Sequence, residues 1–236
     1  MKILALESSA GPGSCAVTEN GKVLASAAMN IGMTHSQTLL PMLQGMLKNA
    51  HLSMADIDVC AVSAGPGSFT GVRIGAAAVK GIAFADEKPC AAVSTLEAMA
   101  CMLRGTPFDG IICCAMDARC AQVYTALFIC EMGKVTRLAP DEAISIESLK
   151  EKLLSLQRPV MLVGDGAEVC RKAFEGIVQP LYMAPDALRY QQAVGVAFAA
   201  EALAERGELC SAQELLPQYL RLPQAERELR ARNGLV

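Results

Sequence analysis

The sequence contains no tryptophan, few other aromatic residues and little net charge, and each shortage excludes a class of function. Aromatic residues make up 4% of the 236 residues, so we do not expect a stacking platform for single-stranded nucleic acid. The formal net charge is −3, whereas a protein that binds nucleic acid on its own needs a basic surface. Any contact of this protein with RNA is therefore expected to be indirect.

Metal-ligand spacings and long apolar runs are also missing. The only histidines are His35 and His51, and neither belongs to a spacing typical of a metal site. No apolar run reaches the roughly 20 residues of a membrane span. The first residues meet an acidic side chain, Glu7, too early for a secretory signal. We expect a cytoplasmic protein without a metal site and without membrane contact.

Cysteine and apolar residues, in contrast, are plentiful. None of the ten cysteines forms a C-x-x-C pair, and most lie in apolar runs, as Cys60, Cys113 and Cys130 do. This pattern is typical of buried, reduced thiols in a cytosolic protein. With 53% hydrophobic residues, the chain can bury a sizeable core, and its length fits one large domain or two small ones.

The chain is organised around a 27-residue stretch, Val59–Ala85, that predicts a strand, a turn and a helix. It begins with a short apolar run, as a strand covered on both faces would. A hydroxyl at Ser68 or Thr70 can cap the helix, because it can accept a hydrogen bond from an unpaired helical N–H. The helix is expected at Ile74–Ala85 and consists mostly of glycine and alanine. Glycine costs a helix interior about 1 kcal/mol relative to alanine, so we expect another backbone to approach this helix closely.

The glycine-rich turn within this stretch has two interpretations. A Walker A loop needs Lys followed by Ser or Thr after its last glycine, whereas Gly71 is followed by Val72 and Arg73. Gly65, Gly67 and Gly71 also have one residue too many for the dinucleotide fingerprint. The helix start can bind an anion near Arg73, or the turn can be a tight connection without a ligand.

The two halves of the sequence predict the same succession of elements. In the first half we expect strands at Lys2–Leu6, Ser14–Thr18, Lys22–Met29, Val59–Val62 and Cys90–Val93, and helices at Ser36–Asn49, Ile74–Ala85 and Ser94–Leu103. In the second half we expect strands at Ile111–Met116, Gln122–Cys130, Lys134–Leu138 and Val160–Val163, and helices at Ile146–Leu156, after Gly166, and at Gln191–Arg206. Hairpin turns are expected at Asn20-Gly21 and Met132-Gly133, and a capping box from Ser94 to Glu97.

This succession is an internal repeat of topology. Glu7 and Asp117 each end the first strand of a half, 110 residues apart. The repeat predicts two similar domains, residues 1–104 and 105–210, with a cleft between them. Residues 211–236 form a C-terminal segment that we expect to pack back on the first domain. Its last part, Glu226–Arg232, is highly charged and is expected to be a solvated helix.

Two halves that each open with a strand ending in a carboxylate resemble the actin/Hsp70/sugar-kinase superfamily. More narrowly, several segments resemble the bacterial TsaB family, accessory proteins for the threonylcarbamoyladenosine modification of tRNA. These segments are ILALESSAGPGSCAV, THSQTLLPML, AVSAGPGSFTGVRIGAAAVKGIA, MDARCAQVY and QYLR. The resemblance implies an α/β fold of two tandem actin/Hsp70/sugar-kinase-like domains, each a mixed sheet with helices on its faces.

The resemblance also implies the function. The chain would be a non-catalytic scaffold that binds and activates a paralogous transferase, TsaD, in modifying tRNAs that read ANN codons. An ATPase subunit, TsaE, would join the pair, and a second copy of the chain would form a homodimer. ATP and a metal would be held by these partners, and we expect no cofactor on this chain.

Two groups of site residues follow. The resemblance implies that the two helices Ser36–Asn49 and Ile74–Ala85 form a helical bundle with a partner, and each helix is expected to cover its own sheet with one face and the partner with the other. The candidate partner interface is His35, Leu39, Leu43, Met46, Arg73, Ile74, Ala77, Ala78 and Gly81. The candidate anion or nucleotide site is Glu7, Ser8, Gly65, Gly67, Ser68, Thr70, Asp117 and Arg119. Active phosphotransferases of the superfamily have a glycine-rich turn after this carboxylate, whereas Asp117 is followed by Ala118 and Arg119, which speaks against nucleotide binding. Arg119 is instead expected to form an ion pair with Asp117.

Two enzymatic alternatives stay open. The first is a nucleotide-dependent phosphotransferase in which Glu7 or Asp117 holds magnesium through water. The second is a peptidase that acts on the partner, although the sequence has neither a metal spacing nor a G-x-S-x-G motif for one.

Overall fold

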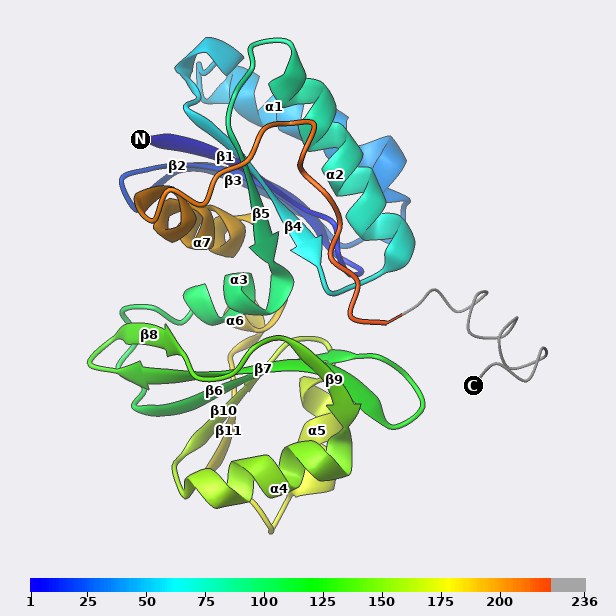
Figure 1. Ribbon diagram of the computed structural model, residues 1–236, viewed down its shortest axis with the longest axis vertical. Helices are drawn as coiled ribbons and strands as arrows, with labels where there is room; N and C mark the ends of the chain where they lie inside the picture. The colour runs from blue at the N-terminus through cyan, green and yellow to red at the C-terminus, as the bar shows by residue number, and fades with distance from the viewer. Residues whose placement is uncertain (222–236) are drawn as a thin grey trace, which may run out of the picture.

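The computed structural model describes residues 1–221 and consists of two lobes, each built on one mixed β-sheet (Figure 1). In the first lobe the strands lie in the order β3-β2-β1-β4-β5, and in the second lobe in the order β8-β7-β6-β10-β11. The first sheet comprises β1 (Lys2–Glu7), β2 (Gly13–Glu19), β3 (Lys22–Met29), β4 (Val59–Gly65) and β5 (Cys90–Ser94). The second comprises β6 (Gly110–Asp117), β7 (Gln122–Glu131), β8 (Lys134–Arg137), β10 (Val160–Val163) and β11 (Leu181–Met183), with β9 (Glu142–Ser145) paired to β7.

The pairing of the strands confirms the α/β fold class and the repeat of topology. In the first sheet β1 pairs antiparallel with β2 and parallel with β4. In the second sheet β6 pairs antiparallel with β7 and parallel with β10 in the same way. Asp117 therefore ends its strand in the same position as Glu7 does in the first lobe.

The central strand β1 is buried on both faces, which explains its unbroken apolar sequence. Leu4 and Leu6 face the layer formed by α1 (His35–Asn49) and α2 (Phe69–Phe84). Ile3 and Ala5 face the opposite layer, because successive side chains of a strand point to opposite faces. The first sheet is thus sandwiched between two layers of helices (Figure 1).

That opposite layer contains α7 (Ala193–Glu205). The helix falls within residues 105–210, yet Ala197 and Ala200 pack against the first sheet. A Cβ at Gly195 would overlap the carbonyl oxygen of Ala98, so the helix lies directly on α3 (Thr95–Cys101). Small side chains permit this close packing, and the chain crosses back to the first lobe before its C-terminal segment.

The second lobe is covered on its outer face by two further helices, α4 (Ile146–Leu156) and α5 (Ala167–Phe174). Its inner face packs against α3, which therefore lies between the two sheets (Figure 1). The adjacent cysteines separate as alternation requires, since Cys113 faces the outer layer and Cys114 faces α3.

Several short elements were not predicted, and α2 begins before the predicted start of its helix at Ile74. The strands β9 and β11, the helix α6 (Asp186–Arg189) and the 3-10 turn η1 (Met54–Asp56) have three or four residues each, too few to show a hydrophobic period. Helix α2 begins at Phe69, because the Ser68 hydroxyl accepts a hydrogen bond from the Gly71 N–H at 3.3 Å.

The expected capping box at Ser94 is half formed. The Ser94 hydroxyl accepts from the N–H of Glu97 at 3.2 Å. The Glu97 carboxylate, however, accepts a hydrogen bond from Arg137 of the second lobe at 2.8 Å, instead of turning back to its own helix. An interlobe contact thus replaces the second half of the cap.

All ten cysteines are free of disulfides, and most are buried. Within residues 1–221, no helix is both long and apolar enough to cross a membrane. The expected helix at Glu226–Arg232 lies outside the described residues.

Candidate functional site

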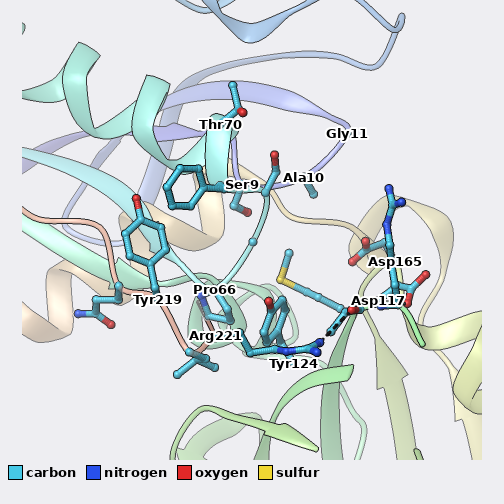
Figure 2. Close-up of a pocket in the computed structure, with 18 residues that line it drawn as sticks. Ser9, Ala10, Gly11, Pro66, Thr70, Asp117, Tyr124, Asp165, Tyr219 and Arg221 are labelled. Carbon is cyan, nitrogen blue, oxygen red and sulfur yellow. Dashed lines mark hydrogen bonds between the residues drawn. The ribbon is translucent and has the colours of Figure 1, made fainter. Parts of the chain in front are cut away.

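The two lobes enclose a cleft of about 600 Å³ (Figure 2). From the first lobe it is lined by the loop after β1 and by the turn that leads into α2. From the second lobe it is lined by the loop after β6 and by Asp165, and the chain's own C-terminal segment lies across it. The lining residues are Ser9, Ala10, Gly11, Pro66, Gly67, Ser68, Phe69, Thr70, Met116, Asp117, Ala118, Arg119, Tyr124, Asp165, Gln218, Tyr219, Leu220 and Arg221.

The glycine-rich turn owes its glycines to contacts within the chain. The Ser68 N–H donates to the Ser9 carbonyl oxygen at 2.7 Å, and a Cβ at Gly67 would lie 2.7 Å from the Ser9 Cβ. A Cβ at Gly71 would overlap the Ser8 carbonyl oxygen. The close approach expected for the helix Ile74–Ala85 is made at Gly75 by side chains, because a Cβ there would overlap the Ser8 Oγ atom.

Glu7 and Ser8, two of the candidate nucleotide residues, do not line the cleft. Both are fully buried beneath the start of α2, where the Ser8 hydroxyl donates to the Gly71 carbonyl at 2.9 Å. The Glu7 Oε1 atom accepts from the Ser9 N–H at 2.6 Å. Strand β1 is fully covered, so its last residues are buried with it, and this placement corrects the expectation.

The protonation of Glu7 follows from that burial. Desolvation raises the pKa of its carboxyl, and the polar groups of Ser9 and the nearby Ser63 offset only part of this effect. The hydroxyls of Ser9 and Ser63 lie near the carboxyl, but neither makes a hydrogen bond of good geometry, and Oε2 has no partner among the described residues. Glu7 is thus a buried acid within the fold and does not line the cleft.

Asp117 does line the cleft, but its expected ion pair with Arg119 is not formed. Asp117 Oδ1 accepts from the Arg119 backbone N–H at 2.7 Å. No salt bridge joins the two side chains in the described structure. The reason is local: Arg119, Cys120 and Ala121 all have positive φ, so the chain turns sharply after Asp117 and presents a backbone N–H to the carboxylate.

A second carboxylate near Asp117 was not predicted. Asp165 lines the cleft from the turn after β10, and burial raises the pKa of its carboxyl, with Asp117 adding to the rise. Gln191 donates a hydrogen bond to Asp165 at 2.9 Å. The sequence could have revealed it, because Asp117 and Asp165 each follow a predicted strand. These strands, β6 and β10, are parallel neighbours, and the carboxyl ends of parallel strands meet at one edge of the sheet.

The C-terminal segment was expected to pack on the first domain, and its described part lies along α2 and the end of β4 (Figure 1). Tyr219 stacks on Phe69 with ring centroids 4.9 Å apart, and Arg73 donates to the Tyr219 hydroxyl at 2.9 Å. Gly65 lies directly beneath Gln218, because a Cβ there would overlap the Gln218 carbonyl oxygen. Two of the candidate residues, Gly65 and Arg73, are therefore engaged by the chain's own end.

The candidate partner interface divides into two groups. Leu39, Leu43 and Met46 are buried in the core between α1 and the first sheet, so they offer no surface to a partner. Their spacing marks the apolar face of an amphipathic helix, and that face covers its own sheet. His35 is half-buried and its Nε2 atom lies 2.8 Å from the Ala10 carbonyl oxygen.

The remaining candidates lie on the other side of α2. Arg73, Ala77 and Gly81 are exposed, and Ile74 and Ala78 are half-buried. Phe84, at the end of the same helix, is 64% exposed, and Leu40 on α1 is 42% exposed. We call the exposed surface of the two helices the α1–α2 face. The residues of it used below are Leu40 and Gly45 of α1 and Arg73, Ala77, Gly81 and Phe84 of α2.

Comparison with known proteins gives consistent matches. The family model described as "TsaD: tRNA N6-adenosine threonylcarbamoyltransferase" matches residues 30–229. The tRNA threonylcarbamoyladenosine biosynthesis protein TsaB of Bacillus subtilis (strain 168) is 30% identical over 227 residues, 96% of each chain. The TsaB protein of Escherichia coli (strain K12) is 34% identical over 167 residues, 70% of this chain and 72% of that protein.

A solved structure agrees with these matches. It is described as an uncharacterized protein with similarity to peptidase YeaZ from Pseudomonas aeruginosa. It superposes with a TM-score of 0.79 at 28% identity, covering 93% of this chain and 99% of its own. The similarity thus extends over both lobes.

Proposed function

The chain belongs to the TsaB family of tRNA threonylcarbamoyladenosine biosynthesis proteins, and from this premise we propose that it is a non-catalytic scaffold that binds and activates the paralogous transferase TsaD. The α1–α2 face is the docking surface. The ATPase subunit TsaE joins this pair, and tRNA reaches the complex through the partners.

The observation that carries this proposal is a pair of helical glycines that neither close packing nor backbone conformation requires among the described residues. Gly45 lies inside α1 and Gly81 inside α2, and a Cβ at either would meet no atom of residues 1–221 within 4 Å. Neither has a positive φ. Glycine there costs each helix about 1 kcal/mol relative to alanine, and no contact among residues 1–221 requires it. Close packing of a partner's backbone against these glycines would offset this loss of helix stability.

The composition around these glycines also suits a protein partner. Ala77 and Gly81 leave the exposed side of α2 nearly without side chains, while the exposed Phe84 offers apolar surface beside Gly81. A shallow groove of about 560 Å³, lined by Gly45, lies between α1 and the edge strand β3. Small residues with apolar neighbours permit two helix pairs to pack closely against each other. A second copy of the chain can use the same face, as an isologous homodimer.

The cleft supports a non-catalytic role for this chain. The Glu7 carboxylate is sealed beneath α2, and the chain's own Gln218 and Tyr219 cover the glycine turn. ATP and a metal ion are accordingly proposed to be held by the partners.

Light scattering of the chain alone and mixed with TsaD tests the docking surface. Ala77→Arg places a long charged side chain on the exposed side of α2 and is expected to abolish the hetero-complex and the homodimer. The matched control is Glu151→Arg, an exposed position on α4 of the second lobe. Equal complex formation by both variants would contradict the proposal.

One observation favours a second candidate function. Asp117 and Asp165 both face the cleft, an arrangement that can hold a magnesium–nucleotide complex through water. The alternative is therefore a nucleotide-dependent phosphotransferase, and calorimetric titration of the isolated chain with Mg-ATP distinguishes it. A peptidase role, suggested by the peptidase to which the Pseudomonas aeruginosa structure is likened, requires that the chain cleave TsaD during co-incubation.

A further inference from the structure

Residues 216–221 cross the mouth of the interlobe cleft and contact both lobes (Figure 1 and Figure 2). We call this segment the C-terminal strap. It lies 150 residues beyond the β4–α2 turn in sequence, so its position there is not imposed by a short connection.

The strap is attached to the first lobe by backbone and side-chain contacts. The Gln218 N–H donates to the Ala64 carbonyl at 2.7 Å, at the end of β4. Tyr219 stacks on Phe69, and the Arg73 guanidinium lies 3.7 Å from the centre of the Phe69 ring while it donates to the Tyr219 hydroxyl. These three side chains form one stacked unit at the start of α2.

The strap is attached to the second lobe at its last described residue. Arg221 Nη1 donates to the Ala118 carbonyl oxygen at 3.0 Å, drawn as a dashed line in Figure 2. Ala118 belongs to the sharp turn after Asp117, in which three successive residues have positive φ. The strap thereby links the turn before α2 to the turn after β6 across the cleft.

On the opposite side the lobes are already joined by α3. Leu96 and Met99 pack against the second sheet, and the Glu97 carboxylate pairs with Arg137. Ser94 donates to Asp141 of the second lobe at 2.5 Å. The lobes are therefore joined on one side of the cleft by the packed helix α3 and on the other side by the strap. Release of the strap would leave α3 as the point about which the lobes can rotate.

The strap also borders the α1–α2 face. Lys80 of α2 donates to the Gln213 carbonyl at 3.1 Å, just before the strap. A small hollow lined by Lys80, Gly81, Phe84 and Gln213 lies between the helix and this segment. A partner that docks on Gly81 therefore meets the base of the strap as well as the helix.

We infer that the C-terminal strap holds the two lobes at a closed angle, and that a partner docked on the α1–α2 face shifts this angle through the strap. The second half of this inference rests on the proposed function, whereas the first half does not. A hydrogen bond from a charged group at a partly exposed site changes a two-state equilibrium by about tenfold. A tenfold change is enough for the strap to favour the closed arrangement of the lobes, and it is small enough for the binding free energy of a partner to reverse it.

Hydrogen exchange of the full chain tests the first half. In Arg221→Ala the amides of residues 118–122 are expected to exchange about tenfold faster, because the second-lobe turn loses its attachment. Tyr219→Ala is the sharper variant, since the stacked unit lies on the first lobe and yet the exchange should rise in the same second-lobe turn. Both positions are partly exposed, and a single cooperative melting transition will confirm that the variants fold.

Matched controls are available for both variants. Arg158→Ala removes an arginine that pairs with Glu131 and Asp109 within the second lobe alone. Tyr182→Ala removes a tyrosine packed edge-on against Phe108, 6.2 Å away. The controls should leave exchange at 118–122 unchanged. If the two strap variants do the same, the strap does not hold the lobes together and the inference is wrong.

A second arm adds TsaD to the unsubstituted chain. Faster exchange at 118–122 in the complex supports release of the strap by the partner. Binding without any change there contradicts the coupling but leaves the docking surface intact. An absence of binding contradicts the proposed function instead, and the substitution arm still decides whether the strap holds the lobes.

Discussion

Ser8 and Gly71 are locked together at the centre of the first lobe: the Ser8 hydroxyl donates to the Gly71 carbonyl at 2.9 Å, and the Ser8 carbonyl occupies the space that a Cβ at Gly71 would need. The end of β1 thereby fixes the start of α2. The same helix carries Gly81, where a Cβ would meet no atom of the described residues within 4 Å. Gly71 is therefore required by close packing within the lobe, whereas Gly81 is not.

The first prediction compares these two glycines in the same helix. Gly71→Ala is expected to destabilise the chain by about 2–3 kcal/mol, because the new methyl group collides with backbone that cannot move aside. Gly81→Ala is expected to stabilise the free chain by about 1 kcal/mol through helix propensity alone. Urea denaturation of both variants measures the two free energies of unfolding. Similar values for the two would show that our account of their surroundings is wrong.

The second prediction concerns the buried acid Glu7. Because its pKa is raised in the folded state, the folded protein binds its proton more tightly than the unfolded chain does. This contribution to stability is fully present below the ordinary value of 4.5 and is lost as the pH rises through the folded-state pKa. Its slope is at most about 1.4 kcal/mol per pH unit.

Glu7→Gln isolates this contribution. The amide keeps an oxygen to accept from the Ser9 N–H, and it carries no charge at any pH. The variant is expected to be more stable than the parent at neutral pH, with the difference vanishing as the pH falls below 4.5. Melting temperatures of both proteins between pH 4 and 8 provide the comparison. A difference that does not change with pH would contradict a raised pKa for Glu7.

The third prediction concerns thiol reactivity. Burial raises the pKa of the thiols of Cys60 and Cys170 to about 12, so almost no thiolate is present at neutral pH. Cys120 is exposed in the turn after Asp117. Titration with a disulfide reagent should show one fast equivalent in the native chain, and Cys120→Ser should remove it. Several fast equivalents would mean that the core opens more readily than its packing indicates.

The repeat of topology was predictable from the sequence, because its signals are local. A strand that ends in a carboxylate, as at Glu7 and Asp117, and a hairpin turn with glycine are each visible in a few residues. The cap at Ser68 was predictable for the same reason, since a capping hydroxyl bonds to an N–H three residues away.

What could not be predicted depends on contacts between distant segments. The spacing of Leu39 and Leu43 identifies an apolar helix face but not which surface covers it, and the fold covers it with its own sheet. The small residues of α7 likewise do not reveal which sheet the helix covers. Tyr219 meets Phe69 across 150 residues of sequence, a distance at which no local pattern operates.

The central claim is that this chain is needed for tRNA modification without performing it. The most direct measurement is a reconstitution with TsaD, TsaE, tRNA and threonylcarbamoyl-AMP, in which modified adenosines are counted with and without this chain. The account predicts that modification depends on the chain and is lost with Gly81→Leu, but not with the control Glu151→Leu on the second lobe. Modification that proceeds equally without the chain would contradict the account.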